Sequence, residues 1–188
     1  PFMPAFSRFS PFAVLAAILF AATAPGLRGE AAFQAGFRAG LDFSYQSKAG
    51  VERKRTVYLW YPTEANEKEV VFGEQKSLAA LHAPATVGRH PLVVFSHGFW
   101  GAADQSVFLM EALARAGYVV AAVHHEDANR QEMRVKMPNF VDAKAWEDDR
   151  FFDRKEDMSA LLDHLLAEDA KEGSPLHERL ARDTIGAA

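Results

Sequence analysis

The chain has 188 residues, a formal net charge of −4, and 49% hydrophobic and 24% charged residues. This is the composition of one ordinary globular domain. Because the charge is negative and the Lys and Arg residues are scattered, nothing indicates a nucleic-acid partner. The sequence contains no cysteine, which excludes disulfide bonds and thiolate chemistry.

The N-terminal segment has the form of a secretory signal peptide. Arg8 precedes the apolar run Phe12–Ala24, which closes on the small residues Ala22-Thr23-Ala24 before a Pro-Gly pair. The run is too short to span a bilayer, and a buried helix of the mature fold is the alternative. The pattern predicts a leader over residues 1–24. It also predicts a secreted or periplasmic domain over residues 25–188, with no transmembrane segment in the mature chain.

The segment before the middle of the chain predicts strands joined by a long connection. Leu41–Tyr45 alternates apolar and polar residues as a strand does. Thr56–Tyr61 is rich in β-forming residues and is stopped by Pro62, which predicts an early antiparallel strand. Thr63–His90 is polar and Ala-rich, and it predicts a surface connection with a short helix near Ser77–His82.

A β-α-β unit follows. Leu92–Phe95 is a short apolar run that predicts a buried strand ending at a His-Gly turn. Asp104 is a suitable N-cap for the next helix, and Gly117 fits the position after its end. The predicted inner face of that helix contains Leu109, Ala112, Leu113 and Ala116. Tyr118–Val123 is continuously apolar, as in a parallel strand covered on both faces.

The last third of the chain predicts a loop, a helix and a strand. The cluster His124-His125-Glu126-Asp127 opens a polar loop that reaches to about Trp146. The acidic stretch Glu147–Glu172 predicts a helix with a solvated charged face. Its predicted inner face consists of Met158, Leu161, Leu162, Leu165 and Leu166. Arg182–Ala188 predicts a further strand.

This order of elements resembles the α/β-hydrolase fold, and more narrowly the platelet-activating-factor acetylhydrolase and dienelactone-hydrolase-like esterases. The resemblance covers roughly residues 40–188. The matching pieces are 57–63, 91–98, 113–121, Arg154, Asp157 and 161–163. It implies an α/β fold with a mostly parallel sheet flanked by helices. This chain would be the N-terminal part of that fold, with the C-terminal half absent.

The resemblance also implies a carboxylic ester hydrolase that works through an acyl-enzyme, without a cofactor or a metal. In such enzymes the N–H of the residue after the His-Gly pair points into the oxyanion hole, which is Phe99 here, on a loop formed by His97 and Gly98. The implied substrate is a small-molecule ester, lipid-like esters included. Trp100 beside the loop is a candidate substrate contact. His125 is another, because ligands bind at the carboxyl ends of parallel strands.

The nucleophile is expected outside the chain. No Gly-x-Ser-x-Gly occurs in the sequence, so the Ser, Asp and His of a triad are expected beyond Ala188, and the chain alone is expected to be inactive. Ser96 lacks the sharp elbow that exposes a nucleophilic hydroxyl. The resemblance gives His97 a role in shaping the loop rather than that of a general base.

Two other classes of function stay open. A non-catalytic exported binding module would keep the same scaffold, with a stop codon where the enzyme continues into Gly-x-Ser-x-Gly. A metal-dependent hydrolase would use His124 and His125. Adjacent residues on a strand point to opposite faces, however, and no His-Glu-x-x-His pattern supports a metal site.

Overall fold

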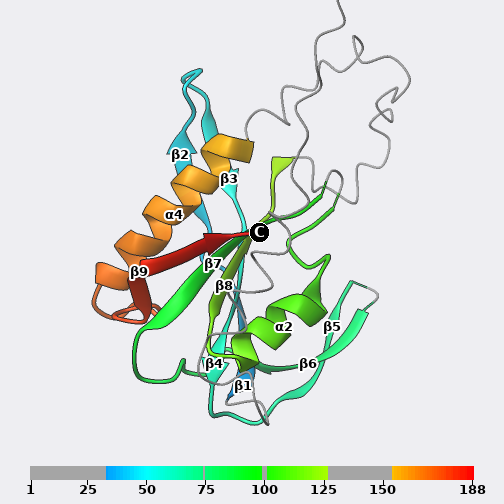
Figure 1. The fold of residues 1–188 in the computed structure, drawn as a ribbon. Helices are drawn as coiled ribbons and strands as arrows, with labels where there is room; N and C mark the ends of the chain where they lie inside the picture. Colours follow the sequence, from blue (N-terminus) through cyan, green and yellow to red (C-terminus); the bar gives the residue numbers. More distant parts are fainter. Residues whose placement is uncertain (1–32, 74, 99–100, 127–153) are drawn as a thin grey trace, which may run out of the picture. The chain divides into compact units, whose positions relative to one another are not determined.

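The computed structural model describes residues 33–73, 75–98, 101–126 and 154–188. These residues form a mixed sheet and a separate hairpin (Figure 1). In spatial order the sheet contains β5 (Lys68–Phe72), β6 (Gln75–Leu81), β1 (Gln34–Ala39), β4 (Val57–Thr63), β8 (Val119–Val123), β7 (His90–Ser96) and β9 (Leu180–Ala187). The hairpin pairs β2 (Phe43–Gln46) with β3 (Glu52–Arg55). The predicted leader lies outside the described residues.

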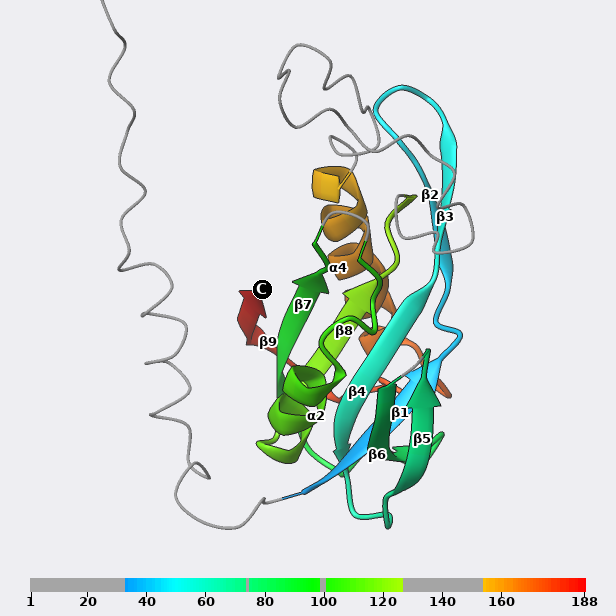
Figure 2. The ribbon, with the colours of Figure 1, turned by 90° about the vertical axis from the view of Figure 1, so that its right-hand side faces the viewer.

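Among the described residues, α2 (Val107–Arg115) covers one face of the sheet and α4 (Arg154–Ala170) covers the other, as Figures 1 and 2 show. Neighbouring residues of a strand point to opposite faces, so Trp60 packs on the α2 side and Leu59 on the α4 side. All of β8 is buried, as its apolar run predicts. Within the described residues, no helix combines the length and apolar character needed to cross a membrane.

The strand directions divide the sheet into two parts. β7 pairs in parallel with both β8 and β9, and β6 pairs in parallel with β1. The pairs β1–β4, β4–β8 and β5–β6 are antiparallel. The predicted parallel unit is therefore confirmed, and so is the antiparallel strand before it, which runs through Pro62 to Thr63. An α/β fold results, in which β8, β7 and β9 form three neighbouring parallel strands.

The prediction of a helix near Ser77–His82 is wrong. These residues belong mainly to β6, which forms a hairpin with β5 and joins the sheet beside β1. Ala79 and Ala80 are buried there, and small side chains let the strand pack under Phe72 and its neighbours. Sheet pairing thus overrides the helix preference of an alanine-rich stretch.

Two details predicted for α2 are also wrong. The helix begins at Val107, after Ser106, so Asp104 is not its N-cap. Leu109 is exposed rather than buried. The buried face consists of Val107, Met110, Glu111 and Ala114. Both sets of residues have helical spacing, so the period alone did not select the face. Gly117 has a φ of 96°, as predicted for the residue after the C-cap.

The inner face of α4 combines leucines with carboxylates. Leu161 and Leu165 are buried as predicted, but Asp157 and Asp169 are also buried, one at each end of this pair of leucines. The expectation of a fully solvated acidic face is therefore wrong. Asp169 accepts hydrogen bonds from the N–H groups of Arg179 (2.8 Å) and Leu180 (2.9 Å). This carboxylate anchors the start of β9 to the end of α4.

Candidate active site

The carboxyl ends of three parallel strands meet at one edge of the sheet. Ser96 ends β7, and His97 and Gly98 follow it, while His124 and His125 follow β8. The N–H of Ser96 donates to the carbonyl oxygen of Ala188 (2.9 Å), which lies directly after β9. In open α/β sheets ligands bind at this edge. The region just beyond the carboxyl end of β7 is therefore the candidate site.

A Ser–His–Asp chain of hydrogen bonds crosses this edge. Ser96 Oγ lies 2.9 Å from His125 Nε2, and His125 Nδ1 lies 2.7 Å from Asp157 Oδ2. The side chains of His125 and Asp157 are 0% and 1% exposed, so the chain of bonds is shielded from water on its inner side. The sequence did not predict that these three residues come together.

Asp157 is a buried carboxylate that binds several neighbouring side chains at this end of the sheet. Its Oδ1 accepts hydrogen bonds from Tyr45 Oη (2.5 Å) and Arg55 Nε (2.7 Å). Burial by itself would raise the pKa of Asp157, but the hydrogen bonds from His125, Tyr45 and Arg55 outweigh it, so the pKa lies below its ordinary value. Burial and the bond to Asp157 raise the pKa of Tyr45, which keeps that hydroxyl protonated as a donor.

The ionised carboxylate determines where the His125 proton lies. A carboxylate only accepts, so His125 Nδ1 carries the proton and donates it to Asp157. In the neutral imidazole, Nε2 is then the acceptor and the Ser96 hydroxyl is the donor. The arrangement has the hydrogen-bond order of a serine-activating triad.

Both ring nitrogens of His97 form hydrogen bonds within the protein. The N–H of His125 donates to Nε2 of His97 (3.2 Å), so the ring proton of His97 lies on Nδ1, which donates to the Gly98 carbonyl (2.7 Å). Its side chain is buried. Protonating Nε2 would break the bond from His125. This geometry suits the loop-shaping role that the family resemblance implies.

Arg154, the first residue of α4, reaches back to the same loop. Its Nη1 donates to the His97 carbonyl at short distance, and its Nη2 donates to the Gly98 carbonyl (3.2 Å). The Gly98 carbonyl also accepts the N–H of Gly101 (2.8 Å), and the N–H of Gly98 donates to Gln105 Oε1 (3.1 Å). Both the carbonyl and the N–H of Gly98 are thus held by hydrogen bonds.

Three of the residues predicted from the sequence, His97, Gly98 and His125, lie together in this network. Phe99 and Trp100 lie outside the described residues, so their predicted roles stay predictions. The sequence reasoning gave no role to the residues that hold the network: Tyr45, Arg55, Arg154 and Asp157. One signal was present, because Arg154 and Asp157 are three residues apart and therefore share one face of their helix with the leucines.

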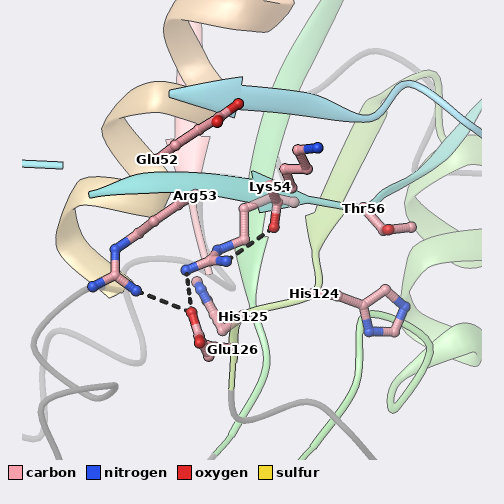
Figure 3. Close-up of a pocket in the computed structure, with 8 residues that line it drawn as sticks. Glu52, Arg53, Lys54, Thr56, His124, His125 and Glu126 are labelled. Atoms are coloured by element: carbon pink, nitrogen blue, oxygen red, sulfur yellow. Dashed lines mark hydrogen bonds and ion pairs between the residues drawn. The ribbon is translucent and has the colours of Figure 1, made fainter. Parts of the chain in front are cut away.

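His124 and His125 point to opposite faces of the sheet, as predicted for adjacent strand residues. His125 bonds to Asp157 on the α4 side, whereas the His124 ring packs edge-on against Tyr58, 4.8 Å between ring centroids. Figure 3 shows the two rings turned away from each other. Within the described ranges, no cluster of three or more His, Cys, Asp or Glu residues could hold a metal ion.

A cavity of about 480 Å³ lies beside His125, and Figure 3 shows the residues that line it. Its lining is polar and charged: Glu52, Arg53, Lys54, Arg55, Thr56, His124, His125 and Glu126. Arg53 (3.0 Å) and Arg55 (3.2 Å) both pair with Glu126 across it. Arg55 also reaches Asp157, so it connects the cavity wall to the buried network. This lining does not provide the apolar surface that an acyl chain would need.

A sheet of this order, with helices on both faces and a His-Gly turn at the carboxyl end of β7, defines an α/β-hydrolase. The sequence model of the family described as platelet-activating factor acetylhydrolase, isoform II, matches residues 54–153, just over half of the chain. The chain belongs to that family.

Solved structures resemble the chain over most of its length. A ferulic acid esterase from Streptomyces cinnamoneus is 23% identical with a TM-score of 0.55, and the match covers 88% of this chain and 53% of that one. The chain thus spans about half the length of that enzyme, and the likeness concerns the fold. A hypothetical protein from Pseudomonas aeruginosa is 16% identical (TM-score 0.41; 82% of this chain, 35% of that one). A bacterial brefeldin A esterase is also 16% identical (0.34; 92% and 40%). The search of curated proteins found no match.

Proposed function

We propose that the whole protein is a serine carboxylic ester hydrolase and that this chain supplies its oxyanion loop. The observation that carries the proposal is the bond between the Ser96 N–H and the Ala188 carbonyl, 2.9 Å. It places the end of β9 directly beside the His97–Gly98 turn. A nucleophile elbow that follows β9 would present its hydroxyl next to that turn. The nucleophile, its Asp and its His are accordingly proposed to follow Ala188.

The proposed reaction is acyl transfer through an acyl-enzyme. The serine hydroxyl attacks the ester carbonyl as the general base removes its proton, and the carbonyl oxygen becomes negative. The intermediate then expels the alcohol, which takes the proton from the base, and water hydrolyses the resulting acyl-enzyme. One N–H after Gly98, that of Phe99, and one N–H after the nucleophile would hold this oxyanion. Preorganised donors of this kind lower the barrier by about 3–4 kcal/mol each. The proposed substrate class is a small-molecule ester, lipid-like esters included, with Trp100 and His125 as proposed contacts.

Ser96 is a second candidate nucleophile, because it is bonded to His125 in the order of a triad. Two features argue for a supporting role instead. Ser96 is the last residue of a regular strand rather than the tip of a sharp turn. The N–H groups of Ser96 and Gly98 already donate to Ala188 and Gln105, so they do not serve as oxyanion donors. We therefore assign the Ser96 hydroxyl to the network that holds the turn.

A fluorophosphonate probe tests both assignments. In the whole protein we expect stoichiometric labelling of one serine, within a Gly-x-Ser-x-Gly that follows Ala188, and peptide mass spectrometry identifies the residue. The Ser96→Ala variant should be labelled at the same residue. The chain that ends at Ala188 should remain unlabelled and should not hydrolyse a short p-nitrophenyl ester above background.

Other outcomes point to other functions. Labelling at Ser96 would make Ser96, His125 and Asp157 the catalytic triad. A whole protein that is neither labelled nor hydrolytic would favour the binding module. Hydrolysis that disappears with a chelator, without any labelled serine, would favour the metal-dependent class.

We also propose that the protein is secreted or periplasmic. The support is the arrangement of Arg8 and the apolar run Phe12–Ala24. N-terminal sequencing of exported protein should begin within a few residues of Pro25. Recovery of exported protein that still carries the apolar run would contradict the proposal.

A further inference from the structure

We infer that Arg154 is a positioning residue that sets the direction of the oxyanion donor. The inference rests on the proposed function and adds to it a residue 56 positions away from Gly98 in the chain. Arg154 does not need to touch the substrate for this role. It acts on the backbone of the turn through the two carbonyl oxygens that it binds.

The first step of the argument is the direction of the two carbonyls. In a regular strand, the carbonyls of successive residues point in opposite directions. The carbonyls of His97 and Gly98 instead both accept hydrogen bonds from one guanidinium group. The chain therefore leaves strand geometry at this point. The planar fork of Arg154 matches two acceptors side by side, which one ammonium group does not reproduce.

The second step is the planarity of the peptide. In a trans peptide the carbonyl of one residue and the N–H of the next point in opposite directions. Fixing the Gly98 carbonyl therefore fixes the direction of the N–H that follows it, which is the proposed oxyanion donor. The Gly98 carbonyl receives Arg154 Nη2 (3.2 Å), His97 Nδ1 (2.7 Å) and the Gly101 N–H (2.8 Å). These donors fix the direction of the Gly98 carbonyl.

The third step is the anchoring of Arg154 itself. Asp157 follows one turn later on α4 and is held by Tyr45, Arg55 and His125. The N–H of His125 in turn holds His97, which supplies a second donor to the Gly98 carbonyl. Both routes from Asp157, through α4 and through His125, end on the same oxygen. A rigid outer layer of this kind keeps reacting groups within the narrow tolerance that catalysis needs.

The test compares Arg154→Met, Arg154→Gln and Arg154→Lys in the whole protein, with Lys155→Met as the matched control on the exposed side of the same helix turn. Turnover is expressed per serine titrated by the fluorophosphonate, which corrects for misfolded protein. We expect kcat to fall at least about 10-fold in Arg154→Met, with KM changed less than about 3-fold and an unchanged pH profile. Arg154→Lys should recover part of the loss, and Lys155→Met should show none.

A second measurement does not depend on activity. Amide hydrogen exchange at Gly101, whose N–H donates to the Gly98 carbonyl, should accelerate in Arg154→Met and Arg154→Gln but not in Lys155→Met. Unchanged kcat per titrated serine, or unchanged exchange at Gly101, would overturn the inference. If the wild-type protein is neither labelled nor hydrolytic, the proposed function fails, and the exchange at Gly101 still decides whether Arg154 holds the turn.

Discussion

Replacing Asp157 with alanine is expected to lower the free energy of unfolding by about 3–5 kcal/mol, the usual scale for removing one partner of a buried ion pair. The change would leave the buried Arg55 guanidinium without its nearest anion, 2.7 Å away. It would also remove the acceptor for Tyr45 and for His125. Urea unfolding, followed by far-UV circular dichroism, measures the difference.

Asp163→Ala provides the control, because Asp163 is an exposed carboxylate on the same helix. This variant should change the free energy of unfolding by no more than about 0.5 kcal/mol. Equal losses in the two variants would show that the burial of Asp157 has no special importance. The role given to the network around it would then be wrong.

The same carboxylate predicts how stability depends on pH. The pKa of Asp157 in the folded protein lies below its ordinary value of 3.8. Its contribution is therefore fully present above about pH 4 and is lost as the pH falls through the folded-state pKa. The stability difference between wild type and Asp157→Asn should be constant near neutral pH and should shrink in acid. A difference that grows on acidification would contradict this sign.

Substituting Gly101 with alanine is expected to reduce kcat of the whole enzyme about 100-fold. A Cβ at this position would lie 2.9 Å from the Gly98 carbonyl oxygen and 1.8 Å from Gln105 Oε1. The Gln105 side chain can move, but it then gives up its bond to the Gly98 N–H, and the backbone oxygen must shift as well. Losing one oxyanion donor costs about 10²–10³ in kcat.

A second glycine calibrates this prediction. At Gly98 a Cβ would meet only Gln105 atoms at 3.8 Å, so Gly98→Ala should cost less than Gly101→Ala. Steady-state kinetics, normalised to the titrated serine, give the ranking. If Gly98→Ala costs as much as Gly101→Ala, the loss does not come from the crowding at Gly101.

The amino-acid sequence by itself determined the elements whose signals are local. The apolar run of β8 is buried on both faces, Gly117 takes the left-handed conformation after α2, and the leucines of α4 face the sheet. Each signal depends on a few neighbouring residues and on the geometry of one helix or strand. The His-Gly turn after β7 is visible for the same reason.

Where the local pattern was ambiguous, the tertiary structure decided. Two sets of residues in α2 have helical spacing, and the sheet selected the set that contains Val107 and Met110. Glu111 can lie on that face because its carboxylate accepts a hydrogen bond (2.6 Å) from the hydroxyl of Ser77, a residue of β6. The sequence of β6 is rich in alanine and favours a helix, but pairing with β1 and β5 makes it a strand of the sheet.

The candidate site depends most on the tertiary structure. His125 and Asp157 are 32 residues apart, and Tyr45 and Asp157 are 112 residues apart, yet all three meet at one carboxylate. No sequence period connects positions so distant, because their contact results from the crossing of β8, β2 and α4. The sequence placed His97, Gly98 and His125 at the edge of the sheet. Only the packing of α4 against the sheet brought Arg154 and Asp157 to them. A buried carboxylate must be hydrogen-bonded, and which donors surround Asp157 depends on how the distant segments pack.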